Sequence, residues 1–194
     1  MLKGIFPVIP TFFTSEDGLD FDALKNTIQF VLEAGAHGVV FPGVASEYSF
    51  LTSEERDALI SFVTEQVNNR VPIVGGASAA KPEEAIAAGQ RAHEHGIDHL
   101  MIMAPRQRGT DIEAQLDFFT TIAASLPESQ FILQNAPNPI GAGLNAEAII
   151  SLATQLPSIT YVKEETLPSG AAISALRRAD IPHLKGIFGG GDPS

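Results

Sequence analysis

The stretch Ile159-Thr160-Tyr161-Val162-Lys163-Glu164-Glu165 sets an apolar, β-branched run directly before three charged residues. Runs of this kind are typical of strands that are buried on both faces of a parallel sheet. Lys163 stands near the carboxyl end of the predicted strand, where burial disfavours the ammonium form and favours a free amine. A free amine is what a Schiff-base nucleophile requires. The alternative is a lysine that extends past the strand end to pair with Glu164, Glu165 or Asp192.

Similar apolar runs recur along the whole chain, and their starts lie 34, 34, 27, 31, 29 and 25 residues apart. They predict seven strands, at residues 4–11, 38–43, 72–77, 99–105, 130–137, 159–165 and 184–190. Helical patterns separate them, at residues 21–34, 53–69, 82–95, 111–126, 145–156 and, more weakly, 169–178. Strands that alternate with helices at this spacing predict right-handed βαβ units and a parallel sheet.

Seven near-equal units favour an α/β fold of the (β/α)8 TIM-barrel type over a doubly wound sheet, because no G-x-G-x-x-G fingerprint opens a helix. Such barrels need about 200 to 250 residues or more, whereas this chain has 194 and ends just past the seventh predicted strand. We therefore expect one barrel domain over residues 1–194, truncated after the seventh strand, without the eighth strand and the C-terminal helices. The sequence then represents an incomplete polypeptide.

The composition restricts the partners of the chain. Twelve basic and 23 acidic residues give a net charge of −11, which repels nucleic acid and anionic membrane surfaces. Without cysteine, neither disulfides nor thiolate zinc sites are expected. No apolar run reaches the roughly 18 residues of a membrane span, and the first residues lack the apolar core of a signal peptide. We expect a cytoplasmic protein.

Active sites of (β/α) barrels lie at the carboxyl ends of the strands. Here those ends are polar and glycine-rich, at residues 10–11, 42–47, 75–78, 104–107, 134–137, 163–165 and 189–192. The triple glycine at 189–191 leaves open a phosphate-handling isomerase, although close approach of the backbone to a substrate is the preferred interpretation because no helix start completes a phosphate site. His93 and His95 stand two apart on a predicted helix and do not share a face, so no metal site is predicted.

Four motifs follow one another along the chain. They are the opening strand Gly4-Ile5-Phe6-Pro7-Val8-Ile9-Pro10-Thr11-Phe12, the loop Gly43-Val44-Ala45-Ser46-Glu47 with its helix start Leu51-Thr52-Ser53-Glu54-Glu55, then Gln134-Asn135-Ala136-Pro137, and Lys163-Glu164. In residue types and order they resemble the motifs of the dihydrodipicolinate synthase/N-acetylneuraminate lyase family of class I, pyruvate-type aldolases and dehydratases. The resemblance runs from Ile5 to the last residue. It implies a Schiff-base lysine at Lys163, no metal or organic cofactor, and a homo-oligomer, by analogy a tetramer.

The positions at which the chain departs from the family pattern are as informative about function as the motifs that match. The Ser/Thr pair that binds the substrate carboxylate in typical members is Val44 and Ala45 here, which leaves backbone N–H groups and the Ser46 hydroxyl. The proton-shuttling tyrosine corresponds to Gln134, which can orient a water or a hydroxyl but cannot titrate. Arg106 follows Pro105, where true synthases have a tyrosine pair, and together with Arg108 it could clamp a sugar-acid carboxylate.

These residues predict a Schiff-base lyase that acts on a small 2-oxo acid, by aldol chemistry with pyruvate or by dehydration of a 2-keto-3-deoxy sugar acid. Lys163 and Gln134 are the expected catalytic residues; Val44, Ala45, Ser46, Arg106 and Gly190 are expected to bind substrate. Without the tyrosine, the base is expected to be a bound water or the substrate's own carboxylate. Two alternatives stay open: a non-catalytic 2-oxo-acid-binding or regulatory relative, and a true 4-hydroxy-tetrahydrodipicolinate synthase.

Overall fold

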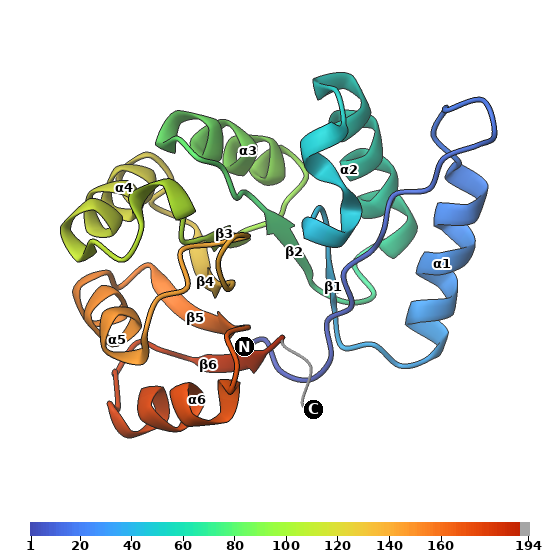
Figure 1. The fold of residues 1–194 in the computed structure, drawn as a ribbon. Coiled ribbons are helices and arrows are strands. Elements are labelled where there is room, and N and C mark those ends of the chain that lie inside the picture. The colour runs from blue at the N-terminus through green and yellow to red at the C-terminus, as the bar shows by residue number, and fades with distance from the viewer. Residues whose placement is uncertain (191–194) are drawn as a thin grey trace. The chain divides into compact units, whose positions relative to one another are not determined.

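A computed structural model describes residues 1–190 of the chain. Within them, helices and strands alternate as the sequence predicts (Figure 1). The helices are α1 (Phe21–Glu33), α2 (Ser53–Val67), α3 (Pro82–Glu94), α4 (Ile112–Ser125), α5 (Ala146–Gln155) and α6 (Ser169–Arg178). The strands are β1 (Val39–Val40), β2 (Ile73–Gly76), β3 (His99–Met103), β4 (Gln130–Asn135), β5 (Ile159–Glu164) and β6 (Gly186–Gly189).

The chain comprises two compact units, and the division falls within α3. The first unit contains Met1–Gly76 and Arg91–Asp98. In it, β1 and β2 pair in parallel, with Val39 opposite Ile73 and Val40 opposite Val74. Helices α1 and α2 pack against each other through Phe21 and Phe62, whose ring centroids lie 4.9 Å apart.

The prediction of a first strand at residues 4–11 is wrong. Only one parallel bridge forms, between Val8 and Val40, in which the Ile9 N–H donates to the Val40 carbonyl and the Val40 N–H donates to the Pro7 carbonyl. In this register the next bonds of the ladder would need N–H groups from Pro7 and Pro42, which have none, so the pairing does not extend on either side. The segment nevertheless follows the path expected of it beside β1.

The second unit contains Ala77–Gln90 and the described residues from His99 onward. Its four strands β3 to β6 pair in parallel in chain order. Leu100, Ile102, Phe131, Leu133 and Val162 are all fully buried, because a parallel sheet covered on both sides requires near-continuous apolar strands. Helices α4, α5 and α6 lie beside one another along this sheet (Figure 1).

Polar side chains cap the starts of α1, α2, α4 and α5. Thr52 and Glu55 form a reciprocal capping box at α2, in which each side chain accepts the backbone N–H of the other residue. Asn145 caps α5 by accepting the Ala148 N–H at 2.8 Å, as predicted. In the second unit these starts fix the loops that follow the strand ends, and those loops hold the candidate site.

Six of the seven predicted strands form, and α6 has the predicted bounds. The fold is α/β, and its succession of parallel strands and helices is that of a truncated (β/α)8 barrel. Among the described residues, no helix is long and apolar enough to cross a membrane. The predicted single domain over residues 1–194 stays a prediction, and Gly191 and Asp192 lie outside the described residues.

Candidate active site

The carboxyl ends of β4 and β5 place four polar residues in two opposed pairs. Gln134 lies opposite Lys163 in the strand register, and Asn135 lies opposite Glu164. Successive side chains of a strand point to opposite faces of the sheet. One pair therefore occupies each face, and the two pairs differ in how their hydrogen bonds are satisfied.

The first pair is joined by a carboxylate from just beyond β5. Glu165 Oε1 lies 2.8 Å from Lys163 Nζ, and Gln134 Nε2 donates to Glu165 Oε2 at 2.6 Å. The Glu165 N–H donates to the Asn135 carbonyl at 3.1 Å, which extends the parallel pairing by one residue and fixes the position of this carboxylate. The side chains of Lys163 and Glu165 are 19% and 17% exposed, so the pair is partly screened from water yet accessible.

Gln134 contributes an acceptor without a partner. The residue is 3% exposed, and its Oε1 has no hydrogen-bond partner among residues 1–190. A buried amide oxygen left unpaired costs free energy, which a hydroxyl or water donor would recover. The role predicted for Gln134, to orient a water or a substrate hydroxyl, stays a prediction.

Gly190 approaches the same pair from beyond β6. Its N–H donates to the Glu164 carbonyl at 3.0 Å. A Cβ at this position would lie 2.6 Å from Lys163 Cε and 2.7 Å from Glu165 Cγ. Only glycine leaves the two side chains where they are. The structure thus brings Lys163, Gln134 and Gly190 together, and adds Glu165 to them.

The second pair, on the other face, belongs to a closed network. Asn135 and Glu164 are fully buried, and Asn135 Nδ2 donates to both Glu164 carboxylate oxygens, at 3.1 and 2.9 Å. The Thr166 N–H donates to Glu164 Oε1 at 2.7 Å, and the Thr166 hydroxyl binds the same oxygen. Asn135 also exchanges two hydrogen bonds with the Leu144 backbone, at 2.8 and 2.9 Å. This network fastens the loop between β4 and α5 to the strand ends.

The loop after β1, in the first unit, is held by Ser46. The fully buried Ser46 hydroxyl donates to the Ile9 carbonyl at 2.5 Å and accepts the Gly43 N–H at 2.9 Å. The Ser46 N–H donates to the Gly43 carbonyl, and the Thr11 hydroxyl donates to the Ser46 carbonyl at 2.7 Å. Ser46 is thus already engaged within its own unit. Its predicted contact with a substrate carboxylate, and those of the exposed Val44 and Ala45, stay predictions.

Tyr48 follows this loop in a short 3-10 turn, Tyr48–Phe50. Burial raises the pKa of the Tyr48 phenol above its ordinary value, and the Arg56 guanidinium opposes this shift in part. The neutral phenol is therefore the form that the folded state favours.

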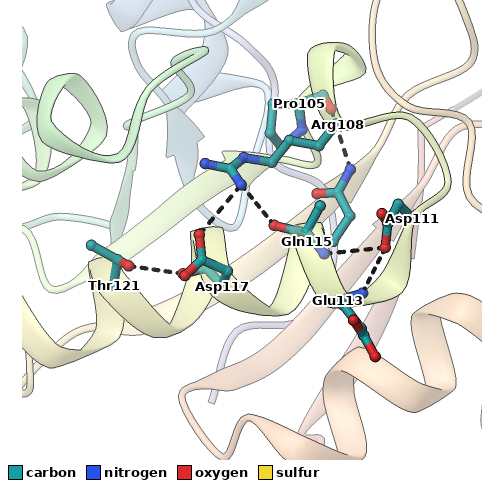
Figure 2. A network of polar contacts seen from close by, with 8 residues as sticks. Pro105, Arg108, Asp111, Glu113, Gln115, Asp117 and Thr121 are labelled. Atoms are coloured by element: carbon teal, nitrogen blue, oxygen red, sulfur yellow. Dashed lines mark hydrogen bonds and ion pairs between the residues drawn. The ribbon is translucent and has the colours of Figure 1, made fainter.

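The two arginines of the predicted carboxylate clamp have different partners. Arg108 Nη1 donates to the Ala114 carbonyl at 3.0 Å and lies 3.4 Å from Asp117 Oδ2, while its guanidinium stacks 5.3 Å from the centre of the Phe118 ring. Figure 2 shows this arginine turned onto α4. Arg106 is exposed, and its Nη1 donates to the Pro139 carbonyl at 3.2 Å. Arg108 thus fastens its own loop, and the predicted contact of Arg106 with a substrate carboxylate stays a prediction.

Gln115 completes that loop. Its buried Nε2 donates to the carbonyls of Pro105 and Gly109, at 3.2 and 2.8 Å, and Asp111 caps α4 by accepting the N–H groups of Glu113 and Ala114 (Figure 2). The turn Arg106–Arg108 is therefore held from both ends. This rigidity fixes the backbone from which the Arg106 side chain extends.

Sequence reasoning did not assign a role in the chemistry to Glu165. A usable signal was present, because Glu165 stands two residues after Lys163 and residues two apart on a strand share a face.

Among residues 1–190, no group of three or more His, Asp and Glu side chains is arranged so that it could hold a metal ion.

Known proteins resemble the chain over most of its length. Residues 1–188 match the Dihydrodipicolinate synthetase family. The 4-hydroxy-tetrahydrodipicolinate synthase of Methanopyrus kandleri is 32% identical over 164 residues, which cover 84% of this chain and 54% of the relative. The enzyme of the same name from Bacillus subtilis is 31% identical over 154 residues, which cover 78% and 52%. The chain thus spans about half the length of these curated relatives.

Solved structures agree on the fold. A dihydrodipicolinate synthase superposes with a TM-score of 0.82 at 28% identity, covering 96% of this chain and 69% of the other. YagE, a prophage protein of the dihydrodipicolinic acid synthase family from E. coli K12, solved in complex with pyruvate, gives a TM-score of 0.83 at 26% identity, covering 96% and 63%. These likenesses confirm the predicted fold class.

Proposed function

The chain belongs to the dihydrodipicolinate synthetase family, and we propose that it is the catalytic part of a lyase that forms a Schiff base with a 2-oxo acid. The observation that carries this proposal is the placement of Lys163 Nζ at a strand end, partly exposed, 2.8 Å from the Glu165 carboxylate. Before it can attack, the Lys163 ammonium must lose a proton, and the Glu165 carboxylate is the acceptor in contact with it.

In the proposed reaction, the Lys163 amine attacks C2 of the substrate, and the C2 oxygen leaves as water to form a protonated imine. The imine accepts the electron pair that is released when the C3–C4 bond breaks, or when a C3 proton is removed before the C4 hydroxyl departs. Gln134 Oε1, which is buried without a partner among the described residues, would accept from the reacting hydroxyl. No metal or organic cofactor is needed for these steps.

The substrate proposed is a 2-keto-3-deoxy sugar acid, with pyruvate as its smallest relative. Gln134 stands where typical members of the family have a tyrosine, and Val44 and Ala45 stand where they have hydroxyls. The backbone of Val44, Ala45 and Ser46, and the guanidinium of Arg106, are the proposed contacts for the acid. Pyruvate is bound to YagE and to a dihydrodipicolinate synthase from Acinetobacter baumannii, which supports a 2-oxo-acid ligand.

A second candidate is 4-hydroxy-tetrahydrodipicolinate synthase itself, which the names of relatives near 30% identity favour. The replacement of the tyrosine by Gln134 weighs against it. A third is a 2-oxo-acid-binding relative without turnover, in which the pair of Lys163 and Glu165 is only structural. We further propose that the whole protein acts in the cytoplasm as a homo-oligomer, by family analogy a tetramer.

Borohydride trapping tests the proposal. The protein is incubated with pyruvate and sodium borohydride, and its intact mass is measured. Reduction of an imine adds one pyruvate, less one water, plus two hydrogens. Lys185→Ala is the matched control, since Lys185 is also a lysine beside a strand end of the second unit and binds Gln130 at 2.6 Å. We expect the adduct in the wild type and in Lys185→Ala, but not in Lys163→Ala. No adduct in the folded wild type would overturn the proposal.

A further inference from the structure

The Lys163 amine has one carboxylate partner in the described part of the chain, and it is Glu165. We infer that Glu165 is the acid–base residue of this site, the group that takes protons from the substrate and returns them. This inference rests on the proposed function, since it needs the Lys163 imine. Glu165 then takes the place of the base that the sequence led us to expect, which was a bound water or the substrate's own carboxylate.

The distances support the assignment. When C2 of the substrate becomes bonded to Lys163 Nζ, C3 is the next atom along the chain of the substrate. Glu165 Oε1 already lies 2.8 Å from Nζ, so this oxygen is close to the C3 protons from the moment the imine forms. A general base must be within hydrogen-bond reach of the proton that it removes, and Glu165 meets this condition without any change in the backbone.

The neighbouring polar groups do not meet the condition. Gln134 lies opposite Lys163 but has no proton that it can exchange. Glu164 is fully buried on the other face, and both of its oxygens accept from Asn135. Arg106 is exposed and remains protonated at any pH at which proteins fold. Glu165 is left as the titratable group in contact with the amine.

Gln134 orients this carboxylate. Its Nε2 donates to Glu165 Oε2 at 2.6 Å, so the second oxygen is occupied while Oε1 faces Lys163. A carboxylate held by one amide donor keeps one oxygen free for proton transfer. The same contact places Gln134 Oε1, without a partner in residues 1–190, next to the carboxylate, where a C4 hydroxyl would find an acceptor and a proton donor together.

The proton balance closes with this single group. Before attack, the Lys163 ammonium passes a proton to Glu165. After attack, the C2 oxygen takes one proton from the bonded nitrogen and this proton from Glu165, and leaves as water. Glu165 then removes a C3 proton, and the electron pair of the C3–H bond forms the C2=C3 bond of a neutral enamine. In dehydration, the enamine expels the C4 oxygen, which takes the proton from Glu165 and leaves as water. In aldol cleavage, Glu165 removes the C4 hydroxyl proton, the C3–C4 bond breaks, and the enamine carbon is reprotonated.

Exchange of the pyruvate methyl protons in D2O, followed by NMR, isolates the base step. Each exchange requires the imine and then removal of a C3 proton, and it needs no knowledge of the natural substrate. Glu165→Gln keeps the shape of the side chain and removes its capacity to accept a proton. We expect Glu165→Gln to exchange about 10²- to 10⁴-fold more slowly than the wild type, the usual contribution of a general base, while borohydride still traps its imine.

Glu147→Gln is the control, because it removes one exposed carboxylate from α5 of the same unit, and it should exchange at the wild-type rate. Exchange by Glu165→Gln within about threefold of the wild type would overturn the inference while leaving the imine chemistry intact. A wild type that forms no adduct would instead remove the proposed function, and the inference with it.

Glu165→Ala with added formate separates a base from a residue that only positions Lys163. If Glu165→Gln also loses the adduct, formate should restore both adduct and exchange to Glu165→Ala, in a manner that depends on formate concentration. Failure of formate to restore exchange under those conditions would show that Glu165 only holds the lysine, and would overturn the inference.

Discussion

Two carboxylates, Glu164 and Glu165, are consecutive in the chain at the end of β5, and they differ in burial and in how many of their hydrogen bonds are satisfied. Glu164 is fully buried, and both of its oxygens are bound by Asn135, with Thr166 at one of them. Glu165, on the other face, binds Lys163 and Gln134 and is 17% exposed. The closed network holds two loops together. The open one has a titratable pair and an unpaired acceptor, which are the properties of a reacting site.

The contrast follows from the geometry of strands. Because successive side chains alternate between faces, two neighbouring polar residues experience different environments although they share a backbone. Burial of an ionised carboxylate is tolerated when several donors surround it, and the Glu164 network supplies them. On the other face the hydrogen bonds are incomplete, and a substrate can complete them. The comparison predicts that substitutions on the Glu165 face change chemistry, whereas those on the Glu164 face change stability.

The largest effect is expected for the nucleophile. Lys163→Met should abolish imine formation and turnover, because no other amine contacts the reactive carboxylate in residues 1–190. Its free energy of unfolding should fall by about 2 kcal/mol or less, because the largely buried Glu165 carboxylate loses its cation but keeps the Gln134 donor. Trapping and urea denaturation measure the two quantities. A Lys163→Met variant that unfolds at much lower urea would assign a structural role to this face instead.

The next effect separates the two faces by stability alone. Asn135→Leu should lower the free energy of unfolding by about 3 kcal/mol or more, because it leaves the buried Glu164 carboxylate without its amide donor. Gln134→Met, the matched change one residue earlier, should cost about 1 kcal/mol or less, because it also removes the unpaired Oε1. Equal costs in urea denaturation would contradict the distinction between the faces.

A smaller effect is expected from a single methyl group. Gly190→Ala places a Cβ 2.6 Å from Lys163 Cε, and the flexible side chain will shift to avoid it. We expect imine formation to slow by about 10- to 100-fold, since displacements near 1 Å are costly to catalysis. In α6, Gly170→Ala meets no atom within 4 Å and should leave the rate unchanged. Stopped-flow measurement with pyruvate compares the two alanine variants.

The smallest effect is expected for Tyr48, in the first unit. Burial raises the pKa of Tyr48 in the folded state. Below the ordinary tyrosine pKa of about 10, the buried neutral phenol makes its full contribution to the free energy of unfolding. That contribution is lost as the pH rises through the pKa of Tyr48 in the folded state. The alkaline side of the stability profile should therefore be less steep in Tyr48→Phe. Identical pH profiles of the two proteins above pH ~9 would contradict this assignment.

The sequence predicted the architecture well, because the signals that mark it are local. Apolar runs mark the six strands, and apolar periodicity, with polar caps at several starts, marks the six helices. The first strand failed because Pro7 and Pro42 lack the N–H groups that the next bonds of its ladder would need, which the apolar pattern concealed. The role of Ser46 depends on the Ile9 carbonyl, 37 residues away in the chain. The orientation of Arg108 likewise depends on α4. Such contacts are tertiary and leave no periodic trace in the sequence.

The reactive face was predicted only in part. Lys163, Gln134 and Gly190 were named from the strand ends and the family resemblance, and the structure brings them together. Glu165 was considered only as a partner of the lysine, although the strand period places it on the same face. Its contact with Gln134 spans 31 residues of chain. Recognising this residue required the register between β4 and β5.

The central claim is that Lys163, on the open face, forms an imine, and residue-resolved mass spectrometry of the borohydride-trapped protein tests it most directly. The protein is digested after trapping with pyruvate, and the modified lysine is located by fragmentation. The account predicts that the reduced pyruvate adduct lies on Lys163 and is absent from Lys185. An adduct confined to other lysines, or no adduct in a protein shown to be folded, would contradict it.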